Sequence, residues 1–280
     1  HERTHTFADL MDVDVAHHRR ATVRRQQPVH QGLQAVGLVH DDARVLLELK
    51  DVKKIYYPGE KNENIALKGI SFSVNEGEFV ALTGQSGSGK SSLLNILGLL
   101  DMPSTGIINI HGQDVTLISS EERADLRLKV ISFVFQFFNL INNLTALENI
   151  MLPLQLQGKS FKEASEIGMR TLTSLDLAHS ADVLARDLSG GEQQRVAIGR
   201  ALCKESAIIL ADEPTAHLDS VRSQEVMDLL LKINKEYGRT IILVTHEREQ
   251  ARQAGRCLVI KDGLIVEDIH RIPVIDGTIV

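Results

Sequence analysis

The 280-residue sequence contains only two cysteines, Cys203 and Cys257. Two cysteines supply neither a disulfide framework nor a zinc-binding pattern, so we expect both to pack as small core residues. Residues 1–20 also lack the apolar stretch and cleavage site of a secretory signal. These absences predict a cytoplasmic protein. A chain of this length can bury a substantial core, as one large domain or two small ones.

Long apolar runs and an excess of positive charge are absent as well. No apolar segment approaches the roughly 18 residues that a membrane-spanning helix needs. The run Leu93–Leu100 is interrupted by Asn95 and stops at Asp101. The 31 Lys and Arg residues against 37 Asp and Glu residues give a net charge of -6. This balance argues against nucleic acid as the main partner.

Residues 1–44 contain no Lys, Ile or Asn, although all three are common afterwards. They carry instead the clusters His17–Arg20 and Arg24–Gln27, with no helical or strand periodicity. A metal-binding or anion-binding tail is one interpretation of these clusters. We favour the other, a disordered or non-native extension, such as translated upstream sequence, before a folded domain at residues 45–280.

One strong motif is present, a glycine-rich loop between a predicted strand, Phe79–Leu82, and a helix that opens at Lys90. It fits the pattern G-x-x-x-x-G-K-[ST]. Glycines in such a loop let backbone N–H groups surround a phosphate, and the helix N-terminus attracts its charge. The flanking strand and helix disfavour the alternative, an ordinary Gly/Ser-rich turn. We predict a nucleotide site formed by Gly84, Gln85, Ser86, Gly87, Ser88, Gly89, Lys90, Ser91 and Ser92.

Two residues of this loop suit a nucleoside triphosphate and its metal ion. Lys90 can reach the β- and γ-phosphates, and the Ser91 hydroxyl can ligate Mg²⁺. An aromatic ring for the base is available about one strand pair earlier, at Tyr56 or Tyr57. For each tyrosine the alternative is an ordinary surface aromatic on a strand.

A second anion-binding feature is predicted where Leu188–Glu192 opens a helix. Ser189 and Glu192 match the S-x-x-E capping box, so locally this segment is simply a good helix start. Gly190 and Gly191 leave the backbone N–H groups of that helix end uncovered, which also suits an anion.

Polar residues end three further predicted strands. Gln136 follows Ile131–Phe135, the acidic pair Asp212 and Glu213 ends a buried apolar strand, and His246 follows Thr240–Val244. A buried pair of carboxylates requires nearby cations. For His246 alone, a packed strand-end histidine is the ordinary alternative.

The alternation of strands and helices predicts an α/β fold with a largely parallel, helix-covered sheet. Helices are expected at Ser160–Leu175 and Ser220–Tyr237, and a hairpin around Asp262 and Gly263. We find no internal repeat.

Taken together and in this order, the motifs resemble those of the ATP-binding-cassette family, the nucleotide-binding subunits of ABC transporters. The resemblance covers Val45 to about Glu267 and rests on the whole set: phosphate loop, Gln136, Leu188–Glu192, acidic strand end and His246. It implies the P-loop NTPase fold of ABC ATPases. That fold has a mostly parallel core sheet, an antiparallel β-subdomain and a helical subdomain, here at about residues 137–188.

The resemblance implies ATP and Mg²⁺ as cofactors. Tyr56, in preference to Tyr57, would stack on adenine. Gln136 would contact Mg²⁺ and the attacking water, and would couple the site to the helical subdomain. Asp212 would hold Mg²⁺ through a water molecule, and Ser91 would complete the metal set.

The resemblance further implies an ATPase with four catalytic residues: Glu213, His246, Gln136 and Lys90. Glu213 would polarise the attacking water as general base. His246 would hydrogen-bond the γ-phosphate and hold base and water in line. Phosphoryl transfer requires positioning and charge neutralisation more than covalent help, so such a set is chemically sufficient.

The family's head-to-tail dimer implies that Ser189, Gly190, Gly191 and Glu192 cap the ATP held by a second subunit, in a homodimer or pseudo-dimer. Hydrolysis would then reopen the dimer and so drive a membrane permease. The expected location is peripheral, at the cytoplasmic face of the membrane. Permease docking is expected near Phe137, Phe138 and Leu140, and no nucleic acid is expected to bind.

Within the family, Phe133–Leu140, Leu144–Asn149 and Gly190–Arg195 look like the macrolide-export and lipoprotein-release branch. Ala216 and His217 depart from that branch, which usually has Gly and a small or amide residue there. Asp219, expected in the loop that crosses to the other subunit, is kept, so the departure concerns cross-dimer communication rather than catalysis.

Two other roles would also fit an ATPase of this family. One is a mechanotransmission ATPase that acts on a membrane partner without moving a substrate. The other is a soluble DNA-repair or translation ATPase, which would require a long coiled coil between Gln136 and Ser189, a second cassette or a basic face. None of the three is evident in the sequence.

Overall fold

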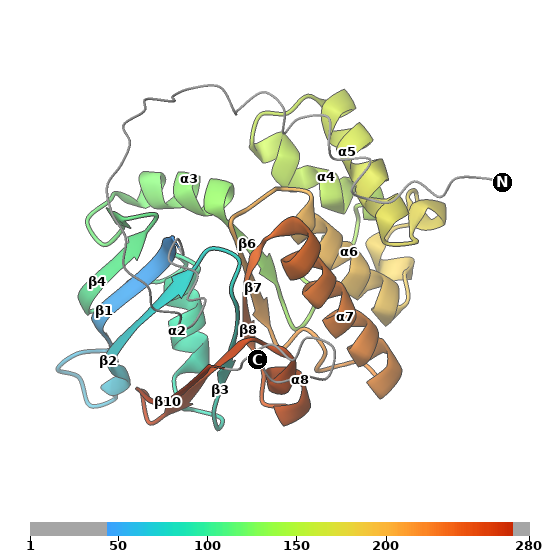
Figure 1. The fold of residues 1–280 in the computed structure, drawn as a ribbon. Helices are drawn as coiled ribbons and strands as arrows, with labels where there is room; N and C mark the ends of the chain where they lie inside the picture. Colours follow the sequence, from blue (N-terminus) through green and yellow to red (C-terminus); the bar gives the residue numbers. More distant parts are fainter. Residues whose placement is uncertain (1–43, 271–280) are drawn as a thin grey trace, which may run out of the picture. The chain divides into compact units, whose positions relative to one another are not determined.

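The structure is a computed structural model and describes residues 44–270. The expected extension at residues 1–44 lies outside the described residues except for Arg44. Figure 1 shows two β-sheets with helices between and around them. The first sheet is antiparallel, in the order β2-β1-β4-β5. Its strands are β1 (Val45–Tyr56), β2 (Asn64–Asn75), β4 (Thr105–Ile110) and β5 (Gln113–Asp114).

The second sheet has the order β10-β9-β3-β8-β7-β6. All neighbouring strands in it run parallel except the hairpin of β9 and β10. The strands are β3 (Phe79–Thr83), β6 (Ile131–Val134), β7 (Ile208–Asp212), β8 (Thr240–Val244), β9 (Arg256–Lys261) and β10 (Leu264–His270). The expected mostly parallel sheet and the hairpin around Asp262 and Gly263 are both confirmed.

The described helices are α2 (Lys90–Leu97), α3 (Ser120–Val130), α4 (Ala146–Leu156), α5 (Phe161–Ser174), α6 (Gly190–Leu202), α7 (Ser220–Tyr237) and α8 (Arg248–Gln253). Two 3₁₀ turns, η2 (Ala178–Ser180) and η3 (Ala185–Asp187), lead into α6. Within the described range, no helix combines the length and apolar character needed to cross a membrane.

Two hydrophobic clusters hold these elements together. The larger one joins the antiparallel sheet, α2 and one face of the parallel sheet, so α2 is packed between the two sheets (Figure 1). The smaller one joins α4, α5 and α6, through residues such as Ile150, Leu172 and Val196. The helical region therefore has a core of its own. Cys203 and Cys257 are both buried and unpaired, as expected.

The parallel arrangement decides where the polar strand ends meet. β3, β6, β7 and β8 are parallel neighbours, and each is followed by one of the predicted polar segments. Because the carboxyl ends of parallel strands share one edge of the sheet, ligand sites form along that edge. This places the glycine-rich loop, Gln136, the acidic pair and His246 on the same side of the molecule.

Candidate functional site

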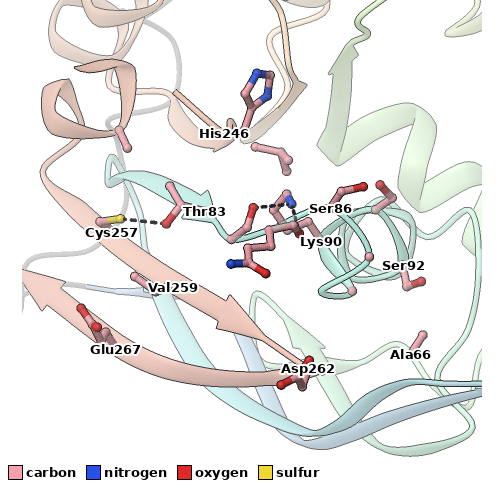
Figure 2. A pocket seen from close by; sticks show the side chains of 18 of the residues that line it. Ala66, Thr83, Ser86, Lys90, Ser92, His246, Cys257, Val259, Asp262 and Glu267 are labelled. Carbon is pink, nitrogen blue, oxygen red and sulfur yellow. Dashed lines mark hydrogen bonds between the residues drawn. The ribbon is translucent and has the colours of Figure 1, made fainter. Parts of the chain in front are cut away.

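The glycine-rich loop leads from β3 into α2 and encloses the Lys90 ammonium group. Lys90 Nζ donates hydrogen bonds to the carbonyl oxygens of Gly84 and Gln85, both at 2.8 Å (Figure 2). Burial lowers the pKa of Lys90, and the nearby carboxylates of Glu213 and Asp212 oppose that change. The loop thus holds a positive charge at its centre without a direct carboxylate partner.

Glycine is required at two loop positions by close packing. A Cβ at Gly84 would lie 2.1 Å from the Ile260 carbonyl oxygen and 2.8 Å from Ser88 Oγ. At Gly89, where φ is +106°, a Cβ would lie 2.6 Å from the Ala66 carbonyl oxygen. Any other residue at these positions would force the loop away from β2 and β9. The motif spacing therefore reflects the path of the backbone.

The same loop offers unpaired donors for an anion. Ser88 Oγ is buried and has no hydrogen-bond partner among the described residues. Helix α2 begins after Gly89 without a side-chain cap, so its first N–H groups remain open. A phosphate at a helix N-terminus satisfies such groups and complements the helix dipole. The loop therefore fits a phosphate chain.

The loop borders a cavity of about 1260 Å³. Strand ends and helices from across the sheet contribute to its walls, and His246 is among the lining residues (Figure 2). Its lining includes the predicted residues Gly84, Gln85, Ser86, Gly87, Gly89, Lys90, Ser91, Ser92, Glu213 and His246. The space is large enough for a nucleotide, since ligand cavities are commonly about 300–1,000 Å³.

An acid–imidazole pair lies at the ends of β7 and β8. His246 Nδ1 is 3.1 Å from Glu213 Oε1. Asp212, at the end of β7, is half-buried, and its pKa is raised by burial and then by Glu213, against the opposing effect of Lys90. Two adjacent carboxylates therefore lie close enough to Lys90 to interact with its charge, and Glu213 also lines the cavity. Two carboxylates with a single nearby lysine leave negative charge that an additional cation could neutralise.

Four residues predicted for this site, Tyr56, Ser88, Gln136 and Asp212, are absent from the cavity lining. The Tyr56 hydroxyl is 3.2 Å from Asp101 Oδ2 and 3.3 Å from Ser92 Oγ, and Lys54 Nζ lies 4.9 Å from its ring centre. Tyr56 thus lies beside a lining residue, Ser92, at the margin of the cavity. Gln136, just beyond β6, contacts His217 instead.

The predicted capping box at α6 is confirmed. Ser189 Oγ accepts a hydrogen bond from the Glu192 N–H, and the Glu192 carboxylate accepts one from the Ser189 N–H at 2.9 Å. The Ser189 hydroxyl also donates to the Glu192 carboxylate at 2.6 Å, and this bond, followed by the one from the Ser189 N–H, lowers the pKa of Glu192. None of Ser189, Gly190, Gly191 and Glu192 lines the cavity of its own chain. Their uncovered helix end therefore faces elsewhere.

Sequence reasoning missed several cations in the cavity wall. Lys68 on β2, and Arg248 and Arg252 on α8, line it. A weak signal was available, because Arg248 and Arg252 are four residues apart just after His246 and so share one face of a helix. For Lys68 no local motif exists, since only the pairing of β2 brings it there.

Comparison with known proteins decides the family. A model of the family described as ABC transporter matches residues 67–216. This chain belongs to the ABC transporter family. It is an ATP-binding cassette ATPase, so the expected fold, ATP binding and ATP hydrolysis are confirmed.

Individual relatives of this ABC ATPase cover it to different extents. It is 48% identical over 227 residues to the lipoprotein-releasing system ATP-binding protein LolD of Aquifex aeolicus. That match covers 81% of this chain and 99% of LolD. It is 49% identical over 209 residues to the macrolide export ATP-binding/permease protein MacB of Campylobacter jejuni. That match covers 75% of this chain but only 32% of the relative, so the chain spans about a third of the MacB length.

Solved structures of other ABC cassettes have the same fold. The ATP-binding cassette MJ0796, in a dimeric post-hydrolysis state bound to ADP and Pi, matches with a TM-score of 0.74 and 41% identity, over 80% of this chain and 98% of that one. The cassette cbiO1 of Clostridium perfringens matches with a TM-score of 0.73 and 27% identity, over 81% of this chain and 89% of that one.

Proposed function

We propose that this ABC ATPase powers a membrane permease of the lipoprotein-release or macrolide-export kind, through ATP-driven closure and opening of a dimer. The observation that carries the proposal is the Glu213–His246 pair, 3.1 Å apart, facing the Lys90 loop across one cavity. The names of its relatives, a lipoprotein-releasing ATP-binding protein and a macrolide export protein, support the branch. Its location would then be peripheral, at the cytoplasmic face of the membrane.

Within this proposal the loop residues bind the phosphates, and Tyr56 stacks on adenine by turning one ring face toward the cavity margin. Glu213 polarises the attacking water, and its contact with His246 holds the carboxylate in place. His246 also donates to the γ-phosphate. Lys90 shifts from the two loop carbonyls to the phosphate oxygens, which are stronger acceptors for an ammonium group.

A magnesium ion would be held by Ser91 and Gln136 directly and by Asp212 through water. Among residues 44–270, no three His, Cys, Asp or Glu side chains cluster as a complete metal site. The ion therefore requires phosphate oxygens as ligands, which is usual for Mg²⁺. When bound, it would neutralise charge on the β- and γ-phosphates. The raised pKa of Asp212 supports this role, because a cation would relieve its repulsion from Glu213.

The second half of each site would come from another copy of the chain. The exposed start of α6, at Ser189–Glu192, has the open N–H groups of a helix end but does not line its own cavity. In a head-to-tail pair it would cap the γ-phosphate of the opposite subunit. The dimeric structure of MJ0796 supports this arrangement. The domain itself would comprise residues 45–280, with the helical subdomain at about 137–188.

The substitution Glu213→Gln tests the site. It should leave ATP binding intact, stop turnover and accumulate an ATP-bound dimer, because the amide cannot act as a base. ATP turnover and size-exclusion chromatography with light scattering are the measurements. The control is Glu249→Gln, since Glu249 is an exposed partner of Arg252 outside the cavity lining. Normal hydrolysis by Glu213→Gln would remove Glu213 as the base.

Permease docking is proposed at Phe137, Phe138 and Leu140 and in the groove beside them. A cavity of about 490 Å³ opens there between α3, α4 and α6. Its lining combines apolar side chains with three cations and contains no carboxylate, which suits an apolar helix of a membrane partner. The lining residues include Leu100, Phe133, Phe135, Asn139, Leu156, Arg127, Arg200 and Lys204.

The docking proposal is tested with charged substitutions at exposed apolar residues. Phe137 is 68% exposed and Leu156 is 65% exposed. Phe137→Lys and Leu156→Lys should abolish co-purification with the co-expressed permease, because a buried ammonium group beside the three cations of the groove has no carboxylate partner and opposes apolar docking. ATP binding by the isolated subunit should be unchanged. Leu117→Lys is the matched control, since Leu117 is 85% exposed and lies outside the groove. Undiminished co-purification would count against the groove.

A further inference from the structure

A turn anchored beside the acid–imidazole pair carries His217. Thr215, in this turn, is buried and accepts a hydrogen bond from Gln250 Nε2 at 2.7 Å. Gln250 Oε1 in turn accepts a bond from Thr245 Oγ1 at 2.8 Å, and Thr245 directly precedes His246. The turn closes on itself, since the Ala216 N–H donates to the Glu213 carbonyl at 3.1 Å. Its base is therefore fixed next to the reacting groups.

The exposed tip of that turn contacts a distant segment of the chain. The His217 ring stacks on Phe137, with centroids 4.8 Å apart and an interplanar angle of 29°. His217 Nε2 also lies 3.4 Å from Gln136 Nε2. Phe137 is 68% exposed, so the imidazole covers part of an apolar ring that otherwise faces solvent. Stacked aromatic pairs of this kind add stability beyond area burial.

We propose that His217 is a positioning residue that ties the Gln136–Phe137 segment to the turn 213–219, so that the two segments move together. The inference rests on the roles proposed above for Gln136, Phe137 and Asp219. It gives the unusual His217 a function: the small or amide residue usual at this position has no ring to stack on Phe137. A movement of the permease-docking segment would then displace the turn through the stack of His217 on Phe137. Because Glu213 and Asp219 are at the two ends of this turn, both would shift with it.

The contact is expected to affect catalysis because it restricts the rotational freedom of the Gln136 side chain. A free glutamine side chain has three rotatable bonds and loses substantial entropy when it is held in one geometry. His217 is the hydrogen-bond partner that the structure shows for the Gln136 side chain. Holding Gln136 near the turn in advance lowers the cost of placing it in the transition state. The effect should appear in kcat rather than in ATP binding.

Three variants of the full chain separate the two contacts. His217→Ala removes both, His217→Phe keeps the stack, and His217→Asn keeps only a hydrogen-bonding group. We expect kcat to fall about three- to tenfold in His217→Ala, the equivalent of one aromatic stack, with KM for ATP within about twofold. His217→Phe should recover most of the loss, because the stack holds Phe137 and with it the adjacent Gln136. His217→Asn has no ring to stack and should behave like His217→Ala. The melting temperature should stay within about 2 °C, because the exposed residue adds little to folding.

A double-mutant cycle tests whether Phe137 is the partner. Phe137→Ala combined with His217→Ala should lower kcat no further than either change alone, because both remove one contact. Additive losses would overturn the proposal. So would an unchanged kcat in His217→Ala, a rise in KM at constant kcat, or His217→Phe behaving like His217→Ala.

A fluorescence readout follows the contact directly. The chain contains no tryptophan, so Phe137→Trp introduces a single reporter that stacks on His217. Its emission should change when ATP binds, and the change should be lost with His217→Ala; an identical change in both would contradict the coupling. Failure of the proposed function can be told apart from failure of this inference. Full ATP turnover by Glu213→Gln would refute the proposed catalytic site, whatever the kcat values of the His217 variants.

Discussion

At the scale of single residues, three buried or half-buried cations, Lys90, Arg200 and Lys204, donate to main-chain carbonyl groups. Lys90 contacts two carbonyls of its own loop. Arg200 donates to the carbonyls of Phe138 and Asn139 at 2.9 and 2.6 Å, and Lys204 donates to those of Arg127 and Ile131. Burial lowers the pKa of Lys90, Arg200 and Lys204. Carbonyl dipoles satisfy these donors but do not neutralise their charge.

The consequence can be measured at Lys204, whose pKa burial lowers from 10.5 to about 8. Between these pH values the unfolded chain retains a proton that the folded protein has released. The free energy of unfolding contributed by Lys204 therefore rises with pH over this window. Relative to Lys204→Met, the wild type should be least stable at pH 7 and should approach the variant by pH 10. Denaturant unfolding at several pH values measures the gap.

Comparison with the variant is necessary because other groups act in the opposite direction. Burial raises the pKa of Cys203 and of Tyr237 to about 12, so the folded protein retains those protons longer and loses stability at high pH. Both groups are present in wild type and variant alike. A gap that does not change between pH 7 and 10 would show that Lys204 ionises normally.

At the scale of elements, four helices begin with the same reciprocal cap. Ser119, Thr145, Ser160 and Ser189 each accept a bond from the third following N–H, whose glutamate returns one. The local physics of helix initiation is therefore alike at α3, α4, α5 and α6. Only at α6 do two glycines follow the cap. This difference distinguishes α6, whose start is the one proposed to present open N–H donors to a ligand.

Matched cap deletions test that distinction. Ser189→Ala and Ser119→Ala should each cost about 1 kcal/mol of stability, because each removes one capping bond. Only Ser189→Ala should also lower ATP turnover and weaken dimer formation with ATP, since Ser119 lies on α3 outside the cavity. Denaturant unfolding and turnover assays measure the two effects. Equal turnover in both variants would argue against a ligand role for the α6 cap.

At the scale of the whole described molecule, one arginine joins the two sheets. Arg256 on β9 is buried, and its guanidinium pairs with Asp268 on β10 through two bonds of 2.8 and 2.7 Å. It also donates to the Ser73 carbonyl on β2 at 2.6 Å and contacts Glu78 at 3.3 Å. The pairing lowers the pKa of Asp268. Loss of Arg256 would leave the carboxylates of Asp268 and Glu78 and the Ser73 carbonyl without this hydrogen-bond donor.

Two arginine substitutions compare this partly buried network with a surface pair. Arg256→Ala should reduce the free energy of unfolding by about 2 kcal/mol, because it leaves two partly buried carboxylates and the Ser73 carbonyl without their donor. Arg252→Ala should cost no more than about 0.5 kcal/mol, since Arg252 and Glu249 are 62% and 78% exposed. Urea denaturation measures both. Similar losses in the two variants would mean that Arg256 does not hold the sheets together.

Short-range chemistry made much of this protein predictable. The phosphate loop, the Ser189–Glu192 cap and the Asp262-Gly263 hairpin each depend on residues a few positions apart, and each formed where it was expected. The apolar run Leu93–Leu100 continues beyond the helix, because Gly98 ends α2 at Leu97 and Leu99 has a positive φ of 54°. A glycine within an apolar run is a weak stop signal by itself.

What the sequence determined by itself was the set of chemical groups and the local elements that present them, because capping, turn geometry and strand alternation act between near neighbours. Only the tertiary structure decided which groups meet. The ordering of β3, β8, β7 and β6 brings Lys90, Glu213 and His246 to one edge. The same packing sets His217 against Phe137, a contact between residues 80 positions apart that no local pattern encodes.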